Sequence, residues 1–435
     1  MVLNGCRKDF SEQPSYSVTS YTGAENLITD SDNYIATSWM TFEVHRIIKS
    51  SATYAPPITA RAIGYTGITM YEIMRNGTPG HASLVGQLSG LKSLPKPDTT
   101  LSYRWSVACN AATAHLIRYL FDNMSAPVRA SLDSLETANN NLLGNTTADD
   151  FVRSVAYGVN LADSIIEWSK PDGGDHGYTT LFPKSYQPPV GLQYWIPTET
   201  QGAVPLLPYW GNNHSFVKND VSITQPSVGP LPYSTSTRSS YYKSANDVYV
   251  TGINLTDEQK TIASFWNDGS SSITPPGHSA SILTDVIKDQ NLGLFEATRA
   301  YARMGITLND VFISCWKTKY TYVAVRPWTY IRANIDSSWV PYIPTPPHPE
   351  FTAGHSTQSG AASTILNALF GSATAFTDHS HDEDGFASRS FASFTDFANE
   401  AALSRVYGGI HYRRTVQLGL KQGRAVALQV LQLNL

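Results

Sequence analysis

The sequence predicts an all-α protein whose helices pack into bundles. Apolar residues recur at helical spacing through most of the chain, and the alternation that marks a half-buried strand is scarce. One long segment, residues 170–255, is rich in Pro, Tyr, Gly and Ser and interrupts the helical pattern. With 435 residues, of which 41% are hydrophobic, the chain is long enough to bury one large core or two smaller ones.

Each expected helix rests on its own apolar pattern or start signal. Residues 33–50 carry Ile35 and Trp39 at helical spacing. Pro56 opens the helix at 56–75, because the missing N–H of a proline has no partner at a helix start. The same periodicity predicts further helices at residues 102–123, 125–143, 148–169, 256–268, 279–290, 293–325, 356–370, 391–407 and 414–433.

Residues 170–255 are expected to form a loop excursion that covers the helical core. They include Tyr186-Gln187-Pro188-Pro189 and Leu206-Leu207-Pro208-Tyr209-Trp210. A structureless insertion of this length is unusual in a compact domain and often has a function. We expect one helical domain at residues 33–435 that carries this excursion.

Composition excludes several classes of function. The net charge is −4 and no long basic run appears, so nucleic acid is not an expected partner. No run of about 18 apolar residues marks a transmembrane helix. Cys6, Cys109 and Cys315 are odd in number and far apart, which excludes a disulfide framework or a zinc site built on them.

The N-terminus suggests export. Leu3-Asn4-Gly5-Cys6 resembles the end of a bacterial lipoprotein signal, in which the cysteine is lipidated after cleavage. Residues 7–32 are polar and Ser-rich, as suits a tether. We therefore expect residues 1–32 to be an exported tether and lipoprotein remnant with a candidate lipid anchor at Cys6. The expected location is the periplasm, the outer membrane or the medium of a bacterium.

Three permanent cations in the last third of the chain suggest an oxyanion site. Lys319 and Arg326 are seven positions apart, on one face of a helix that Pro327 is expected to end. Arg405 is the third cation. The guanidinium fork matches the oxygens of a tetrahedral or trigonal anion such as phosphate or vanadate.

Two histidines accompany these cations. Gly354 and His355 precede an apolar helix, whose free N-terminal amides favour an anion. His411 follows Arg405 by six positions, beyond an expected helix break at Gly408-Gly409. One imidazole can bond the central atom of the anion, and the other can move a proton.

The order Lys-x6-Arg-Pro, Gly-His, Ser-Arg-x5-His resembles the superfamily that unites vanadium-dependent haloperoxidases with type 2 phosphatidic acid phosphatases. The strings at 398–412 and at Pro275-Pro276-Gly277-His278 look like bacterial haloperoxidases of the iodo- or bromoperoxidase type. The resemblance covers roughly residues 35–430 and is weaker before 260. It implies the helical bundles of the vanadium haloperoxidase fold, with the site motifs at 316–411.

The resemblance also implies a cofactor, substrates and roles. Vanadate would be bonded to a ring nitrogen of His411. Hydrogen peroxide would oxidise halide to hypohalous acid, and inorganic phosphate would compete with vanadate. Lys319 would polarise the bound peroxide, and His355 would be the acid–base. The residues placed around the vanadate oxygens are Lys319, Arg326, Ala353, Gly354 and Arg405.

Two positions depart from the family pattern. Ala353 stands where the family usually has Ser, which removes a hydroxyl whose bond to a charged group is worth about 1.5–3 kcal/mol. Thr415 stands where the phosphatase branch often has Asp. Because a nucleophilic imidazole benefits from a carboxylate on its other nitrogen, Thr415 weakens the phosphatase alternative.

Two aromatic positions bear on the choice of halide. Trp316 resembles the fungal chloroperoxidases, whereas His348 resembles the algal bromoperoxidases. The combination leaves the halide open, but iodide is the easiest to oxidise and bromide is next.

Two further histidine-containing segments are expected to have structural or solvent-exposed roles. The loop Asp378-His379-Ser380-His381-Asp382-Glu383-Asp384-Gly385 lacks the full calcium-binding pattern and is expected to be a solvated acidic loop. His278 is expected to be structural.

The prediction is thus a vanadate-dependent enzyme that oxidises iodide, and in second place bromide, with hydrogen peroxide. One alternative is an acid phosphatase with His411 as nucleophile. The other is a non-catalytic lipoprotein that binds an oxyanion or a glycan, although binding alone would not need both His355 and His411.

Overall fold

The computed structural model describes residues 33–198, 204–269 and 271–435. Within these residues the fold is all-α, as predicted, with one two-stranded antiparallel sheet, β1 (Phe376–Asp378) and β2 (Arg389–Phe391). No described helix is long and apolar enough to cross a bilayer. The expected tether and the anchor at Cys6 lie outside the described residues.

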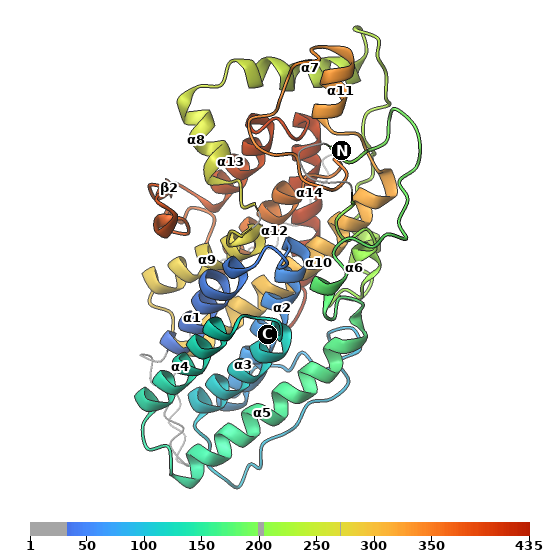
Figure 1. The fold of residues 1–435 in the computed structure, drawn as a ribbon. Coiled ribbons are helices and arrows are strands. Elements are labelled where there is room, and N and C mark those ends of the chain that lie inside the picture. Colours follow the sequence, from blue (N-terminus) through green and yellow to red (C-terminus); the bar gives the residue numbers. More distant parts are fainter. Residues whose placement is uncertain (1–32, 199–203, 270) are drawn as a thin grey trace, which may run out of the picture.

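The helices follow the predicted order, with three additions, α6, α7 and α11. They are α1 (Asn33–Phe42), α2 (Pro56–Met74), α3 (Trp105–Leu120), α4 (Ala126–Leu143), α5 (Asp149–Ser169), α6 (Asp220–Ile223), α7 (Ser240–Ile253), α8 (Asp257–Phe265), α9 (Thr274–Asp289), α10 (Leu294–Tyr322), α11 (Pro327–Asn334), α12 (Gly354–Phe370), α13 (Phe394–Tyr407) and α14 (Arg413–Val430). In Figure 1, α1–α5 occupy one end of the molecule, and α7, α8, α11, α13 and α14 occupy the other.

Two helix crossings in the core are close enough to require glycine. A β-carbon built on Gly67 of α2 would lie 2.5 Å from the carbonyl oxygen of Tyr301 on α10. A β-carbon on Gly423 of α14 would lie 1.8 Å from the carbonyl oxygen of Thr357 on α12. Glycine is therefore required at both crossings, because protein interiors have no free volume for a shift of this size. The second crossing holds the N-terminal half of α12 against α14.

The excursion at 170–255 is shorter than predicted, because α7 occupies its last part. Ser239 caps this helix by accepting from the amide of Tyr242. Tyr241 and Val248 of α7 are buried against Tyr330 of α11. Tertiary packing thus stabilises α7 despite its weak sequence signal, because burial of an amphipathic face contributes more than propensity. The preceding residues cover the core, as predicted, through buried Leu206, Trp210 and Phe216.

The prediction that Pro327 ends a helix is wrong. Helix α10 ends at Tyr322, and Pro327 is the first residue of α11, with Arg326 as the capping residue before it. Arg326 therefore lies outside α10 and does not share a helix face with Lys319. The fixed φ and missing N–H of proline suit a first helical position. The turn between the two helices brings Arg326 back towards the C-terminal motifs.

Candidate active site

A cavity of about 540 Å³ opens between α9, α10 and the N-terminus of α12. Five of the predicted site residues line its inner end, namely His348, Gly354, His355, Arg405 and His411. Trp316 of α10 also contributes to the lining. Residues from four separate segments of the chain therefore converge on one space, as the oxyanion hypothesis requires.

Arg326 supports this inner end from behind without lining the cavity. Its Nη1 donates to the carbonyl oxygen of Ile410 at 2.9 Å and lies 3.0 Å from Nε2 of His411. Its Nη2 lies 3.0 Å from Nδ1 of His348. Burial lowers the pKa of the guanidinium to about 10, so Arg326 remains a cation at neutral pH.

Lys319 is fully buried beside the same segment. Its ammonium donates to the carbonyl oxygens of Pro349, at 2.8 Å, and of Thr352. Burial lowers the pKa of this amine to about 7, because the charged form loses its hydration. Lys319 therefore loses its charge more readily than an exposed lysine would, and an anion placed nearby would favour the charged form.

Ala353 is buried and occupies the capping position of α12. Its carbonyl oxygen accepts from the amide of Thr357 at 2.9 Å, and it does not line the cavity. Gly354 follows as the first helical residue and does line the cavity. The helix N-terminus expected for Gly354 and His355 is therefore present.

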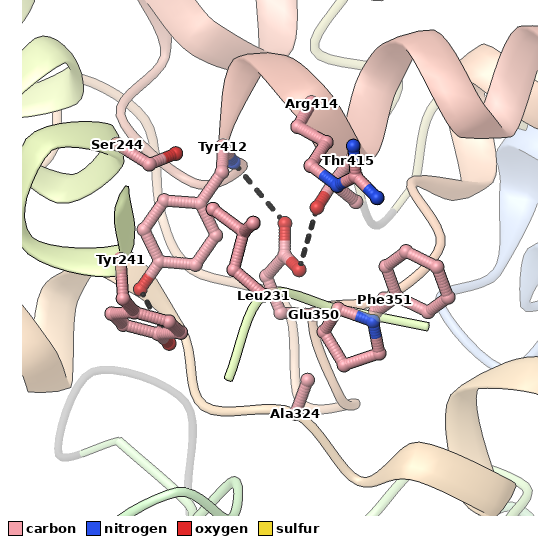
Figure 2. Close-up of a pocket in the computed structure, with 10 residues that line it drawn as sticks. Leu231, Tyr241, Ser244, Ala324, Glu350, Phe351, Tyr412, Arg414 and Thr415 are labelled. Atoms are coloured by element: carbon pink, nitrogen blue, oxygen red, sulfur yellow. Dashed lines mark hydrogen bonds between the residues drawn. The ribbon is translucent and has the colours of Figure 1, made fainter. Parts of the chain in front are cut away.

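His411 has a carboxylate partner that the sequence analysis missed. Nδ1 of His411 lies 2.9 Å from Oε1 of Glu350, whose Oε2 accepts from the Thr415 hydroxyl at 3.1 Å. Figure 2 shows this carboxylate between the amide of Tyr412 and the side chain of Thr415. The argument from Thr415 against a phosphatase is therefore wrong, because Glu350 supplies the carboxylate and Thr415 orients it.

Burial is the main cause of the pKa shifts of His411 and Glu350. It lowers the pKa of His411 well below the usual value, with further repulsion from Arg326 and Lys319, so the imidazole is neutral. Burial also raises the pKa of Glu350 to about 7. Since Glu350 faces Nδ1, the lone pair of the neutral His411 ring lies on Nε2, where it faces the Nη1 donor of Arg326.

His355 presents an unsatisfied nitrogen. Among the described residues, its buried Nε2 has no hydrogen-bond partner, and it lies 3.7 Å from Oδ2 of Asp268. Burial, followed by repulsion from Arg405, lowers the pKa of His355 well below the usual value. The Arg405 guanidinium donates to the carbonyl oxygen of Trp266 and to Oγ of Ser404. A bound oxyanion near Arg405 would satisfy this nitrogen and favour its protonation.

The acidic loop that begins at Asp378 is partly buried, contrary to the prediction of a solvated loop. His278 lies with Nδ1 3.0 Å from Asp268 and Nε2 2.8 Å from Asp378. His381 lies with Nε2 3.0 Å from Asp268 and Nδ1 3.0 Å from Asp384. Asp268 thereby joins this cluster to His355.

Asp268, His278 and His381 are also the described residues whose ligand atoms, all within 4.8 Å, could hold a metal ion. Hydrogen bonding accounts for the cluster without one, since carboxylates face both nitrogens of each ring. Burial opposes the charge of His278, but Asp268 and Asp378 outweigh burial and raise its pKa to about 10. We therefore interpret the cluster as an ion-pair network.

The donor set fits vanadate or phosphate. The buried cations Arg326 and Arg405, the helix N-terminus at Gly354 and the unpartnered Nε2 of His355 offer donors to an oxyanion. The neutral imidazole of His411 offers a nitrogen ligand, backed by a carboxylate as metal-bound histidines usually are.

Comparisons with known proteins agree with this chemistry. A family model of the VCPO second helical-bundle domain matches residues 299–434. No curated protein sequence matches the chain significantly. The crystal structure described as the first bacterial vanadium-dependent iodoperoxidase is 33% identical, with a TM-score of 0.82, and the match covers 93% of this chain and 96% of that one.

Two bacterial vanadium-dependent chloroperoxidase structures share the fold at lower identity. The holo-type structure is 17% identical, with a TM-score of 0.68, over 87% of this chain and 92% of that one. The apo-type structure is 18% identical, with a TM-score of 0.67, over 87% and 94%. Given the extent of the match to the iodoperoxidase, the chain belongs to the vanadium-dependent haloperoxidases, a family that oxidises halide with hydrogen peroxide.

Proposed function

We propose that the protein binds vanadate at His411 and oxidises iodide with hydrogen peroxide, with bromide as the second-best halide. The observation that carries this proposal is the pairing of two neutral imidazoles, the buried His411 and the half-buried His355, in one cation-rich pocket. His411 is backed by Glu350, and His355 has a free Nε2. The 33% identity to an iodoperoxidase supports iodide.

Vanadate, when bound, supplies a Lewis-acidic centre that activates peroxide, and the oxidation state of vanadium does not change. The protein supplies charge and proton handling. Arg405 and the amide of Gly354 would hold the oxygens from the cavity lining. Arg326 and Lys319 lie behind that lining and would join them on leaving their present partners. His355 would accept a proton at Nε2 and return it as peroxide binds and oxidised halide leaves.

We propose that Trp316 and His348 contact the halide. Their rings lie 5.1 Å apart at the cavity wall, and Arg326 holds His348 by two hydrogen bonds to its carbonyl oxygen and a contact to Nδ1. A large, polarisable anion such as iodide suits a wall formed by two aromatic rings beside a cation. These two residues are the proposed halide environment.

The decisive assay measures iodide oxidation by the metal-free protein with hydrogen peroxide, before and after orthovanadate is added. We expect activity to require vanadate and to be suppressed by inorganic phosphate, because both anions would occupy the same donors. Failure of vanadate to produce activity would contradict the proposal.

Acid phosphatase activity is a second candidate, favoured by the Glu350–His411 contact. A carboxylate on Nδ1 increases the nucleophilicity of Nε2, and His355 could protonate a leaving group. Hydrolysis of an aryl phosphate by the metal-free protein, blocked by vanadate, would support it. The two activities would then share one pocket and exclude each other at high vanadate.

Glu350→Gln is expected to weaken vanadate binding by about 10- to 100-fold, because removing the carboxylate behind a metal-bound histidine lowers the basicity of the ligand. Titration of the metal-free variant with orthovanadate, followed by activity and by calorimetry, measures the change. Thr415→Val is the matched control: it removes one hydrogen bond to the same carboxylate and keeps the charge. Equal vanadate affinity in Glu350→Gln and the native protein would contradict the role of Glu350.

Ala353→Ser is expected to tighten phosphate binding to the metal-free protein by about 10- to 150-fold and to change halide preference. A hydroxyl here would add one hydrogen bond to a charged group, worth about 1.5–3 kcal/mol. Calorimetry measures the affinity. The unfolding midpoint provides the control, because a serine that only capped α12 would raise stability by about 0.5–2 kcal/mol without changing affinity.

A further inference from the structure

The cavity is much larger than the proposed small reactants require. Its volume is about 540 Å³, whereas a water-sized molecule needs about 30 Å³ and an apolar cavity of about 150 Å³ accommodates benzene. Peroxide and a halide ion would leave most of the outer part unfilled, even with an oxyanion at the inner end. Cavities of this size usually accept an organic ligand.

The outer part of the cavity has an apolar wall. Its side chains come from Tyr54, Phe182, Leu206, Phe312 and Pro346. Most of this wall is buried, but Phe182 is 43% exposed at the cavity. A half-exposed phenyl ring beside Leu206 and prolines offers a flat apolar surface that a planar molecule could cover.

Hydrogen bonds hold this wall in place. The amide of Leu206 donates to the carbonyl oxygen of Pro347 at 2.8 Å, and the amide of Leu207 donates to that of Leu181 at 2.7 Å. The carbonyl oxygen of Leu206 accepts from the Tyr320 hydroxyl at 2.6 Å. Because the wall is already ordered, a ligand would bind without the entropic cost of ordering a loop.

We propose that this wall binds a neutral, electron-rich aromatic molecule of one or two rings, which is the acceptor of the oxidised halogen. A neutral molecule is favoured because the lining carries opposite charges, the Arg405 guanidinium and the Asp268 carboxylate, so neither ion sign gains overall. An anion would also compete for the oxyanion donors. The role of this molecule as halogen acceptor rests on the proposed function, whereas the binding of an aromatic molecule to the wall is independent of it.

The transfer balances without another reactant. Hypoiodous acid formed at the inner end provides an electrophilic iodine, and the aromatic ring forms a C–I bond as the I–O bond breaks. The ring then loses a proton, which combines with the departing hydroxide to give water. Iodination inside the cavity would precede escape of hypoiodous acid to the solvent.

Binding can be tested without vanadate. The metal-free protein, saturated with inorganic phosphate, is titrated with 1,3,5-trimethoxybenzene and followed by calorimetry and saturation-transfer NMR. We expect saturable binding, weakened about tenfold in Phe182→Ser by loss of the aromatic contact. Tyr34→Ser is the control, because Tyr34 is equally exposed at 43% but does not line the cavity.

A second readout uses the vanadate-loaded enzyme with iodide, peroxide and the same aromatic. Phe182→Ser is expected to oxidise iodide at the native rate but to release more free triiodide and less iodoarene. Absence of saturable binding to the native protein, or equal affinity in Phe182→Ser, would overturn the acceptor site even if iodide is oxidised. Saturable binding without iodide oxidation would instead contradict the proposed function and the acceptor role. The cavity would then be only a binding site for an aromatic molecule.

Discussion

Replacing His411 by alanine is expected to abolish vanadate-dependent iodide oxidation, with a loss well beyond 100-fold. Loss of a residue that only supports a metal ligand typically costs about 10–100-fold, and loss of the ligand itself should cost more. The His411 imidazole is neutral and buried, and Glu350 orients it through Nδ1. Steady-state rates across a vanadate titration measure the effect.

A matched control separates ligand loss from misfolding. His115 lies on α3, pairs with Asp163 and is partly exposed outside the cavity lining, so His115→Ala should retain activity. Calorimetry with phosphate provides a second readout for His411→Ala, because Arg326 and Arg405 remain and should still bind the anion weakly. Native-like vanadate affinity and activity in His411→Ala would contradict its assignment as the ligand.

Replacing His278 by alanine is expected to cost about 3–5 kcal/mol of unfolding free energy, the usual effect of breaking a buried ion pair. His278 lies between Asp268 and Asp378, and all three side chains are almost fully buried. Its removal would leave carboxylates without their shared cation. Urea unfolding, with comparison of midpoints and slopes, measures the loss.

His379→Ala is the control from the same loop. His379 is 52% exposed and pairs with Asp382 at the surface, so its removal should cost no more than about 1 kcal/mol. His278→Gln, which keeps a polar group between the carboxylates, should be less destabilising than His278→Ala and covers the case in which the alanine variant fails to fold. Equal stability of His278→Ala and the native protein would contradict the network.

The free energy of unfolding that the network contributes should decrease both at high pH and at low pH. The pKa of His278 is raised to about 10, so its contribution is complete below the unfolded value of 6.5 and is lost as pH rises through 10. Burial opposes the charge on Asp268, but its histidine partners outweigh burial and hold its pKa well below 3.8. The stability that Asp268 contributes is complete above its unfolded pKa of 3.8 and is lost as the pH falls through its lower pKa in the folded protein. The stability difference between native protein and His278→Ala should therefore be largest from about pH 4 to 6.5.

Local signals in the sequence predicted most of the helices and misplaced a few boundaries. Pro56 begins α2 as expected, but Pro327 begins α11 instead of ending α10, since proline suits a helix start as well as a helix stop. Helix α7 was missed because its Tyr- and Ser-rich sequence has a weak apolar pattern. Its packing on Tyr330 compensates for that weakness.

The sequence by itself determined the all-α class and the residues that suit an oxyanion, because apolar periodicity and the three polar motifs are local patterns. Only the tertiary structure decided which other side chains contact and orient these site residues. Glu350 meets His411 from 61 residues away, and Asp268 meets His381 from 113 residues away. No local sequence pattern predicts either contact, because the packing of separate helices and loops sets the geometry of both pairs. A buried carboxylate that supports a catalytic histidine is recognisable only once the fold has removed both from water and placed them in contact.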